Sequence, residues 1–158
     1  MKKQTVKIKY SNQDTPRLQE IKQGDCIDLY IDSIDEITNE YFKVSFGVAM
    51  KLPKGYIAKI YPRSSTYKRF HLLLSNSVGI IDNSYSGDND VWRGIFIRTN
   101  KKTKLPGKGD RIAQFEIVPS MKMKTWRKLV HLLSSSFNFK EVDHLDSKSR
   151  GGFGSTGK

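Results

Sequence analysis

The fold class is decided by one stretch, Tyr41-Phe42-Lys43-Val44-Ser45-Phe46-Gly47-Val48-Ala49-Met50, in which large apolar residues alternate with polar or small ones. Successive side chains of a strand point to opposite faces, so this period of two predicts a strand with one buried face. Weaker alternation recurs at 6–10, 27–31, 56–61, 91–98 and 111–118. Turn residues separate these runs at 53–55, 82–84, 86–89 and 106–109. Short strands with frequent turns predict an all-β fold, an antiparallel sandwich or barrel.

One segment has a helical period instead. Trp126, Leu129, Val130 and Leu133 are spaced i, i+3, i+4 and i+7, which predicts one short amphipathic helix over 125–133. We expect its apolar stripe to pack on its own domain, although a basic helix of this kind can also bind a membrane surface or an acidic partner. The residues after it are polar and end in a glycine-rich tail with too little apolar content to fold alone. The expected organisation is therefore a β domain over 1–140 and a flexible arm over 141–158.

Charge and composition narrow the class of protein. The 158 residues suffice for one domain, and 28 basic against 16 acidic side chains give a net charge of +12, which favours a polyanionic ligand. Nine of the basic residues fall in 101–128, a run that most often marks a solvated face. A single cysteine, Cys26, and three scattered histidines do not support a disulfide or a zinc site. The sequence has no apolar run long enough for a membrane helix and no signal peptide, so we expect a cytoplasmic protein that does not bind membranes.

Three segments carry side chains suited to phosphate binding or proton transfer. Arg63 is followed by Ser64, Ser65 and Thr66 directly after an expected strand, where several donors can face one phosphate. The segment 74–87 is expected to form a tight hairpin with Asp82 at its bend. An aspartate there is either a turn residue or a carboxylate held rigidly for general-base chemistry. The tail 151–158 offers glycine N–H groups that can converge on an anion.

Taken in order, these pieces resemble the five motifs of the trimeric dUTPase family. They are Asp28-Leu29-Tyr30, Pro62-Arg63-Ser64-Ser65, Asn76 through Gly87, Gly109-Asp110-Arg111-Ile112-Ala113-Gln114, and Gly151-Gly152-Phe153-Gly154-Ser155-Thr156-Gly157. The resemblance covers nearly the whole chain. The stretch between the fourth and fifth motifs is longer than is usual in the family, as in phage and viral members that carry insertions there.

The resemblance implies an antiparallel jelly-roll-like β-barrel and hydrolysis of dUTP to dUMP and pyrophosphate, in sites shared between the subunits of a homotrimer. Asp82 is implied as the general base that polarises a water for attack on the α-phosphorus. Tyr85 is implied to pack on the deoxyribose and exclude a ribose 2′-hydroxyl. The resemblance also implies Mg²⁺ on the phosphates, with Asp28 acting on the metal through water.

The remaining substrate contacts implied by the resemblance fall into three groups. The uracil edge is assigned to Asn76 and the hairpin backbone, including Gly79 and Ile81. The phosphate chain is assigned to Arg63, Ser64, Ser65 and Gln114. The closing arm is assigned to Phe153, which stacks on the base, with Gly154, Ser155 and Thr156. For the terminal phosphate, Lys148 stands at the aligned position, but Arg150 is favoured for its planar fork.

This sequence departs from the family pattern at several positions. Cys26-Ile27 stands where Gly-Tyr is usual, Ser65 replaces a glycine, Ser84 replaces an acidic residue, and Lys148 replaces an arginine. These departures bear on the fine phosphate contacts and leave Asp82 and Tyr85 in place.

Other functions remain open at this point. Arg63-Ser64-Ser65 followed by Arg69 also resembles the related dCTP deaminases, but deamination needs a glutamate after the hairpin and residues 92–100 contain no carboxylate. A basic β domain with Trp92 and Trp126 is a third reading, as a binder of single-stranded nucleic acid. That reading leaves Asp82 and the glycine-rich tail unexplained, so nucleic acid is not the expected partner. A regulatory role is a further alternative, in which the insertion 120–140 with its Trp126 helix would bind a protein partner.

Overall fold

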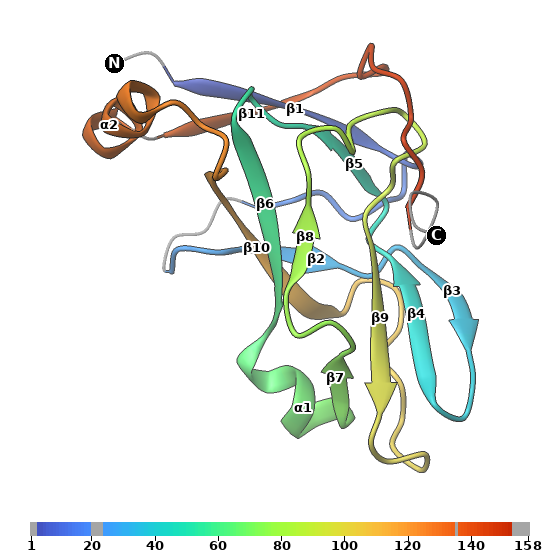
Figure 1. Cartoon of the computed structure of the whole chain (residues 1–158). Coiled ribbons are helices and arrows are strands. Elements are labelled where there is room, and N and C mark those ends of the chain that lie inside the picture. Colours follow the sequence, from blue (N-terminus) through green and yellow to red (C-terminus); the bar gives the residue numbers. More distant parts are fainter. Residues whose placement is uncertain (1–2, 20–23, 135, 153–158) are drawn as a thin grey trace.

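Eleven strands and two helices form the part of the chain that the computed structural model describes, residues 3–19, 24–134 and 136–152. The strands make three sheets (Figure 1). The first sheet has the order β11 (Phe137–Glu141), β1 (Gln4–Tyr10), β5 (Val48–Lys51). The second sheet has the order β2 (Ile27–Tyr30), β10 (Arg111–Pro119), β6 (Tyr56–Pro62), β8 (Gly79–Ile81). The third sheet has the order β3 (Ser33–Ile37), β4 (Tyr41–Ser45), β9 (Arg93–Arg98), β7 (Leu72–Leu74). All pairs are antiparallel except β1 with β11. The predicted mainly antiparallel β fold is confirmed.

One core lies between the sheets. Its largest fully buried side chains are Trp92, Phe42, Phe46, Phe96 and Phe115, which come from different sheets and the segments that join them. The Trp92 and Phe115 rings meet edge to face with centroids 5.1 Å apart. Burial of aromatic side chains is the largest favourable contribution that single residues can make, so these rings fix how the sheets pack.

The run Tyr41–Met50 is not one continuous strand, which corrects the sequence prediction. The apolar face is buried as expected, but Ser45, Gly47 and Ala49 of the other face are buried as well. The strand β4 ends at Ser45, and β5 begins at Val48 in a different sheet. The break lies at Gly47, whose φ is +65° and whose missing Cβ would stand 2.6 Å from both the Asp32 Cβ and the Thr15 Cγ2. A glycine is required there, and the bend carries the strand from one sheet to the next.

A second helix, α1 (Ser64–Phe70), was missed from the sequence, where one short helix was predicted. Only Thr66 of its seven residues is buried, so no apolar stripe signals the helix. The Thr66 hydroxyl donates a 2.6 Å hydrogen bond to the Ile112 carbonyl, which ties α1 to β10. His71 closes the helix in the left-handed conformation, at φ 51°.

The segment 74–87 also differs from the predicted hairpin. β7 pairs with β9 and β8 pairs with β6, so the bend at 75–78 joins two sheets. Asp82 is not at that bend. It follows the other end of β8, in a separate turn closed by a 3.0 Å hydrogen bond from the Tyr85 N–H to the Asp82 carbonyl.

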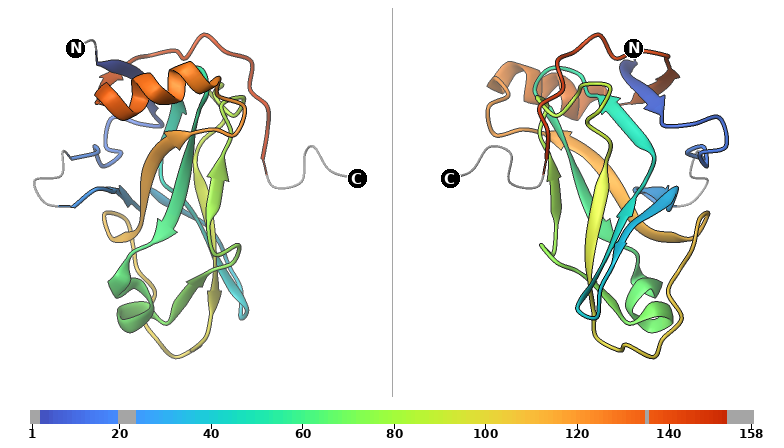
Figure 2. Two further views of the ribbon diagram at one scale, coloured as in Figure 1. Left: turned by 60° about the vertical axis from the view of Figure 1, so that its left-hand side comes forward. Right: turned by 90° about the vertical axis from the view of Figure 1, so that its right-hand side faces the viewer.

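The predicted amphipathic helix exists as α2 (Thr125–Ser134), but its apolar stripe does not pack on the domain. Trp126, Leu129 and Leu133 are 59%, 58% and 71% exposed. The helix lies across one end of the molecule (Figure 2). The His131 Nδ1 is 3.2 Å from the Tyr56 hydroxyl, and the Arg127 Nη1 donates a 3.3 Å hydrogen bond to the Lys54 carbonyl. Its polar contacts hold it with the apolar side turned outward, so the expectation of internal packing is wrong. Within the described residues, neither helix is long and apolar enough to cross a membrane.

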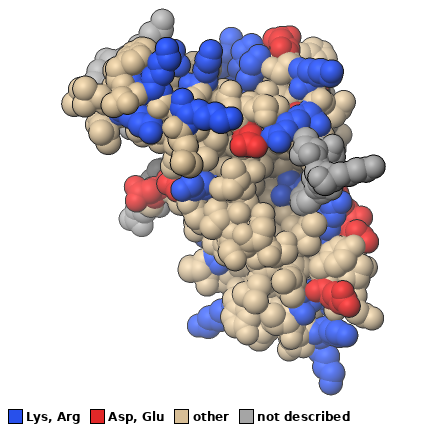
Figure 3. Space-filling model, in the orientation of Figure 1, with Lys and Arg blue, Asp and Glu red and all other residues tan. Residues whose placement is uncertain are grey.

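The basic run 101–128 is divided in space. Lys101 and Lys102 follow β9 at one end of the molecule, whereas Lys124, Arg127 and Lys128 belong to the α2 end. The nine residues of β10 separate the two groups by about 30 Å at ~3.3 Å per residue. Figure 3 shows Lys and Arg side chains gathered over the α2 end.

Candidate active site

The proposed base, Asp82, stands on an exposed turn at the end of β8. Its Oδ2 accepts a 2.9 Å hydrogen bond from the Arg150 Nη1, which also donates to the Ser84 hydroxyl over 3.0 Å. The Asp82 side chain is 55% exposed, and its Oδ1 makes no hydrogen bond to any described residue. One oxygen of this carboxylate is thus paired with a cation while the other faces solvent.

Tyr85 lies three residues further along the same turn. Its hydroxyl donates a 3.0 Å hydrogen bond to the Val91 carbonyl, and burial raises the pKa of this phenol. The described end of the arm passes close to the ring, because a Cβ on Gly152 would lie 3.2 Å from the Tyr85 hydroxyl. Asp82, Tyr85 and Arg150 therefore form one cluster, which we call the catalytic turn.

A second cluster, the arginine end, lies where β6 finishes. The Arg63 Nε is 2.8 Å from Asp28 Oδ1, and the Arg111 Nη1 is 3.1 Å from Asp28 Oδ2. Strand register builds this group, since Asp28 of β2 is opposite Gln114 of β10, which is opposite Tyr61 of β6. The Gln114 amide reaches the Pro62 carbonyl at 3.5 Å, and Ser64 and Ser65 begin α1 beside it.

Tyr61 belongs to the same end. Its hydroxyl donates a 2.6 Å hydrogen bond to Glu116, and this bond raises the pKa of Tyr61 to about 12. The carboxylate favours the protonated phenol because a phenolate there would face a second negative charge. Tyr61 is thus paired with Glu116 on the strand that leads to the arginine end.

The catalytic turn and the arginine end of one chain are far apart. Ile81 pairs with Ala58, so Asp82 is level with the start of β6, whereas Arg63 follows its last residue (Figure 1). About six residues of strand separate the two levels, or ~20 Å at ~3.3 Å per residue. Asn76 and Gly79 lie at the opposite end of β8 from Asp82, because Gly79 pairs with Ile60.

The structure describes only some of the tail residues that were predicted to contact the nucleotide. Phe153, Gly154, Ser155 and Thr156 lie outside the described residues. Of the two candidate cations, Arg150 reaches Asp82 and Ser84, whereas the Lys148 ammonium makes no hydrogen bond or ion pair within the described part of the chain. Sequence reasoning missed Arg111 and Asp90, and it read Asp88 only as part of the turn 86–89, because glycine and asparagine beside it give an ordinary turn pattern.

Comparison with known proteins gives one consistent result. A family model described as dUTPase matches residues 26–157. The SPbeta prophage-derived deoxyuridine 5′-triphosphate nucleotidohydrolase of Bacillus subtilis is 43% identical over 153 residues, which is 96% of this chain and 97% of that protein. The deoxyuridine 5′-triphosphate nucleotidohydrolase of Clostridium tetani is 31% identical over the full length of both chains, 163 aligned residues.

Solved structures agree on the fold. The crystal structure of dUTPase from Streptococcus mutans superposes with a TM-score of 0.62 at 24% identity, covering 73% of this chain and 93% of that one. A mutant of the Staphylococcus bacteriophage 80alpha dUTPase with dUpNHpp superposes with a TM-score of 0.60 at 19% identity, covering 97% and 98%. At these identities the structures establish the architecture alone.

Proposed function

The chain belongs to the dUTPase family, and we propose that it hydrolyses dUTP to dUMP and pyrophosphate with Asp82 as the general base. The observation that carries the mechanism is the state of the Asp82 carboxylate. Arg150 holds one oxygen at 2.9 Å, while the other has no partner among the described residues and is open to a water. A positioned carboxylate with one free oxygen is what a general base needs.

In the proposed reaction, the oxygen of the water forms a bond to the α-phosphorus, and Asp82 Oδ1 accepts a proton from that water. The bond from that phosphorus to the oxygen bridging to the β-phosphate breaks, and pyrophosphate leaves with the bonding electrons. Asp82 then returns the proton to solvent. The adjacent guanidinium fixes the orientation of the carboxylate before the reaction.

We further propose that a complete site needs more than one chain, in a homotrimer. The phosphate donor Arg63 stands about 20 Å from the level of Asp82 in the same chain, a span of about six strand residues, and Gln114, which is opposite Tyr61, stands about 13 Å from it. One nucleotide bound at Asp82 cannot have its α-phosphate next to that base and also contact these donors of the same subunit. A closed ring of copies places the arginine end of one chain near the catalytic turn of the next.

Magnesium fits this site as an ion held mainly by the substrate. One structural neighbour, a dUTPase from a Staphylococcus aureus phage, is described with a structural Mg(II) ion. In this chain both oxygens of Asp28 are already engaged by Arg63 and Arg111, and no three His, Cys, Asp or Glu side chains in the described residues group as a metal site. Phosphate oxygens and water would be the direct ligands, with Asp28 accepting hydrogen bonds from those waters. The bound ion would neutralise phosphate charge.

The test is incubation with each deoxynucleoside triphosphate and Mg²⁺, followed by pyrophosphate detection. We expect release from dUTP and not from dCTP, dATP, dGTP or dTTP. Ammonia released from dCTP would instead indicate a deaminase, which the carboxylate-free strand β9 disfavours. A gel shift with single-stranded DNA that persists at moderate salt, without pyrophosphate release, would indicate the nucleic-acid reading.

We also propose that α2, in the insertion 120–140, is a contact surface for a protein partner. Its exposed leucines and Trp126 are the specific observation, because surface helices rarely expose such a stripe unpartnered. The double variant Leu129→Ser and Leu133→Ser is expected to leave dUTP turnover and trimer mass unchanged. Loss of the trimer in sedimentation would assign this face to subunit contact instead.

A further inference from the structure

Asn83, the residue after the proposed base, is bound by a segment far from it in sequence. Its Nδ2 donates hydrogen bonds to the Pro53 carbonyl at 2.9 Å and the Leu52 carbonyl at 3.1 Å, and it lies 3.3 Å from the Tyr56 carbonyl. A side-chain amide has two N–H groups, so it can satisfy two of these carbonyls fully and share a proton with the third. The side chain therefore ties the turn 82–85 to the turn between β5 and β6.

The turn that accepts these bonds is itself fixed to the sheets. The Tyr56 N–H donates to the Pro53 carbonyl at 3.1 Å, and the Ser120 N–H donates to the Gly55 carbonyl at 2.8 Å. The side chains of Leu52 and Tyr56, on either side of the turn, are buried in the core. The acceptors therefore belong to a rigid part of the molecule, because local opening is rare where backbone bonds and buried contacts combine.

Strand pairing does not extend to the proposed base. The last pair between β8 and β6 is Ile81 with Ala58, one residue before Asp82. The bond from the Tyr85 N–H to the Asp82 carbonyl closes the turn but does not join it to a sheet. The Asp82 side chain is 55% exposed, so core packing does not hold it either. The amide of Asn83 supplies a direct attachment of this turn to the start of β6.

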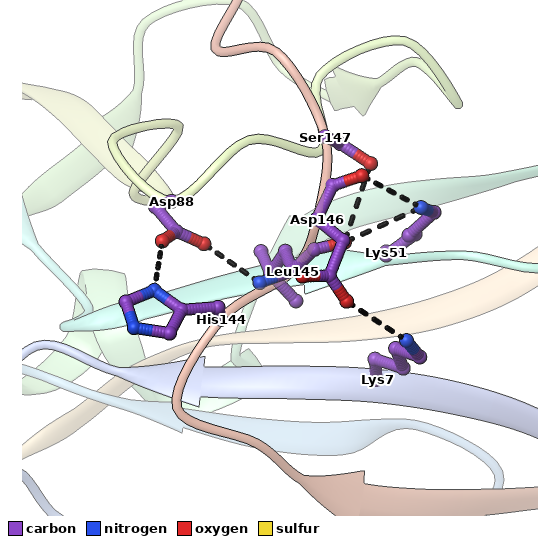
Figure 4. Close-up of polar contacts among 7 residues, drawn as sticks. All are labelled: Lys7, Lys51, Asp88, His144, Leu145, Asp146 and Ser147. Atoms are coloured by element: carbon purple, nitrogen blue, oxygen red, sulfur yellow. Dashed lines mark hydrogen bonds and ion pairs between the residues drawn. The ribbon is translucent and has the colours of Figure 1, made fainter.

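The arm is attached to the neighbouring loop by separate contacts (Figure 4). Asp88 accepts a 2.7 Å hydrogen bond from the Leu145 N–H and lies 2.8 Å from the His144 Nδ1. Asp90, which is fully buried, accepts at 2.9 Å from the Arg150 N–H. These bonds lie beyond the turn that carries the proposed base, so they do not replace its attachment to β6.

We propose that Asn83 is a positioning residue, which sets the place of the Asp82 carboxylate relative to β6. This role depends on the proposed function of Asp82 as the general base. The amide donors of Asn83 face main-chain carbonyls, so the side chain acts on the base through the backbone and does not bind the nucleotide. A catalytic group must be held to within about 0.5 Å, and a misplacement of about 1 Å can cost about a hundredfold in rate.

Three variants test this role by steady-state kinetics with dUTP and Mg²⁺. Asn83→Ala removes the amide, and Asn83→Gln keeps both donors on a stem that is one methylene longer. Asn100→Ala is the matched control. The Asn100 side chain also holds a turn, by accepting a 3.0 Å hydrogen bond from the Lys102 N–H, but this turn follows β9 and is not attached to the proposed base.

The expected result is a loss in kcat with little change in KM. Asn83→Ala should lower kcat by about tenfold to a hundredfold, because the base is no longer held against the attacking water. KM and the binding of a non-hydrolysable dUTP analogue should change less than about twofold, and Asn100→Ala should keep the wild-type kcat. Wild-type kcat in a folded Asn83→Ala protein would overturn the proposal. A higher KM at constant kcat would also overturn it, because Asn83 would then act in substrate binding.

Asn83→Gln carries the test if the alanine variant does not fold. It keeps the donors and should therefore melt closer to the wild type. The longer stem displaces the turn, so kcat should still fall while KM changes little. Wild-type kcat in Asn83→Gln would show that the length of the side chain does not set the base, and the proposal would fail.

Hydrogen exchange tests the attachment without any need for activity. Exchange of the Tyr85 amide, which donates to the Asp82 carbonyl at 3.0 Å, should be about tenfold faster in Asn83→Ala. The Asp110 amide, which donates to the Gly107 carbonyl also at 3.0 Å, should keep its rate. Unchanged exchange of the Tyr85 amide would overturn the proposal. Failure of the proposed function has a different signature, since wild-type protein would then release no pyrophosphate from dUTP.

Discussion

The two ends of strand β6 are built in different ways. At the arginine end, Asp28, Gln114 and Tyr61 stand side by side because three neighbouring strands of one sheet are in register. At the catalytic turn, Asp82 and Tyr85 meet Arg150 only because the arm 144–152 is docked on the loop 86–90. The first end is part of the sheet, whereas the second exists only while the arm stays in place.

This difference separates stability from activity. Backbone ladders hold the arginine end, so changes there should affect folding as well as phosphate binding. The arm adds side-chain and backbone bonds at the surface, so its loss should leave the core intact. Changes at the catalytic turn should therefore reduce turnover with little effect on melting.

The largest expected effect is that of Asp82→Asn. The amide keeps the shape and can still accept from Arg150, but it cannot take the proton of the attacking water. Turnover of dUTP should fall by about two to four orders of magnitude, while binding of a non-hydrolysable dUTP analogue, measured by calorimetry, survives. Asp143→Asn is the control, and near-normal turnover of Asp82→Asn would remove the aspartate from the mechanism.

Removal of the arm after Ser147 comes next. The truncated chain loses Arg150 and every residue beyond it but keeps Leu145, which is fully buried. Turnover should fall by about a hundredfold or more, because water is no longer excluded and the arm donors are lost. The melting temperature should change little. A large drop in melting temperature would show that the arm is part of the folded core, and the contrast between the two ends would fail.

A smaller effect is expected from the two arm cations. Arg150→Ala removes the guanidinium next to Asp82 and should lower dUTP turnover by about tenfold to a hundredfold. Lys148→Ala, two residues earlier and without a partner in the described structure, is the matched control and should be nearly silent. Steady-state kinetics of both variants show which of the two cations supports dUTP turnover. A stronger effect of Lys148→Ala would assign the phosphate contact to the aligned position instead.

The same contrast explains what the sequence could predict. Alternation in 41–50 and 111–118 and the turn residues between strands predicted the β fold, because burial of one face leaves a pattern along the chain. The motif resemblance singled out Asp82 and Tyr85, and the planar fork of the guanidinium favoured Arg150 over the aligned Lys148. The break at Gly47 and helix α1 were missed because a close approach and one buried threonine leave no periodic signal. Asp88 and Asp90 were missed because their partners are 57 and 60 residues away.

The smallest predicted effect concerns the arginine end alone. The pKa of Tyr61 is raised to about 12 by its hydrogen bond to Glu116, against an ordinary value near 10. A pKa raised by folding contributes stability that is fully present below pH ~10 and is lost as the pH rises towards ~12. Wild-type protein should therefore lose more stability over this range than Tyr61→Phe, measured as melting temperature against pH. Phenolate absorbance should show one late-titrating tyrosine fewer in that variant. Glu116→Gln should bring the Tyr61 titration back towards its ordinary range. Asp82 is about 13 Å away along β6, and its solvent-exposed charge is screened over that distance, so Asp82→Asn should not move it.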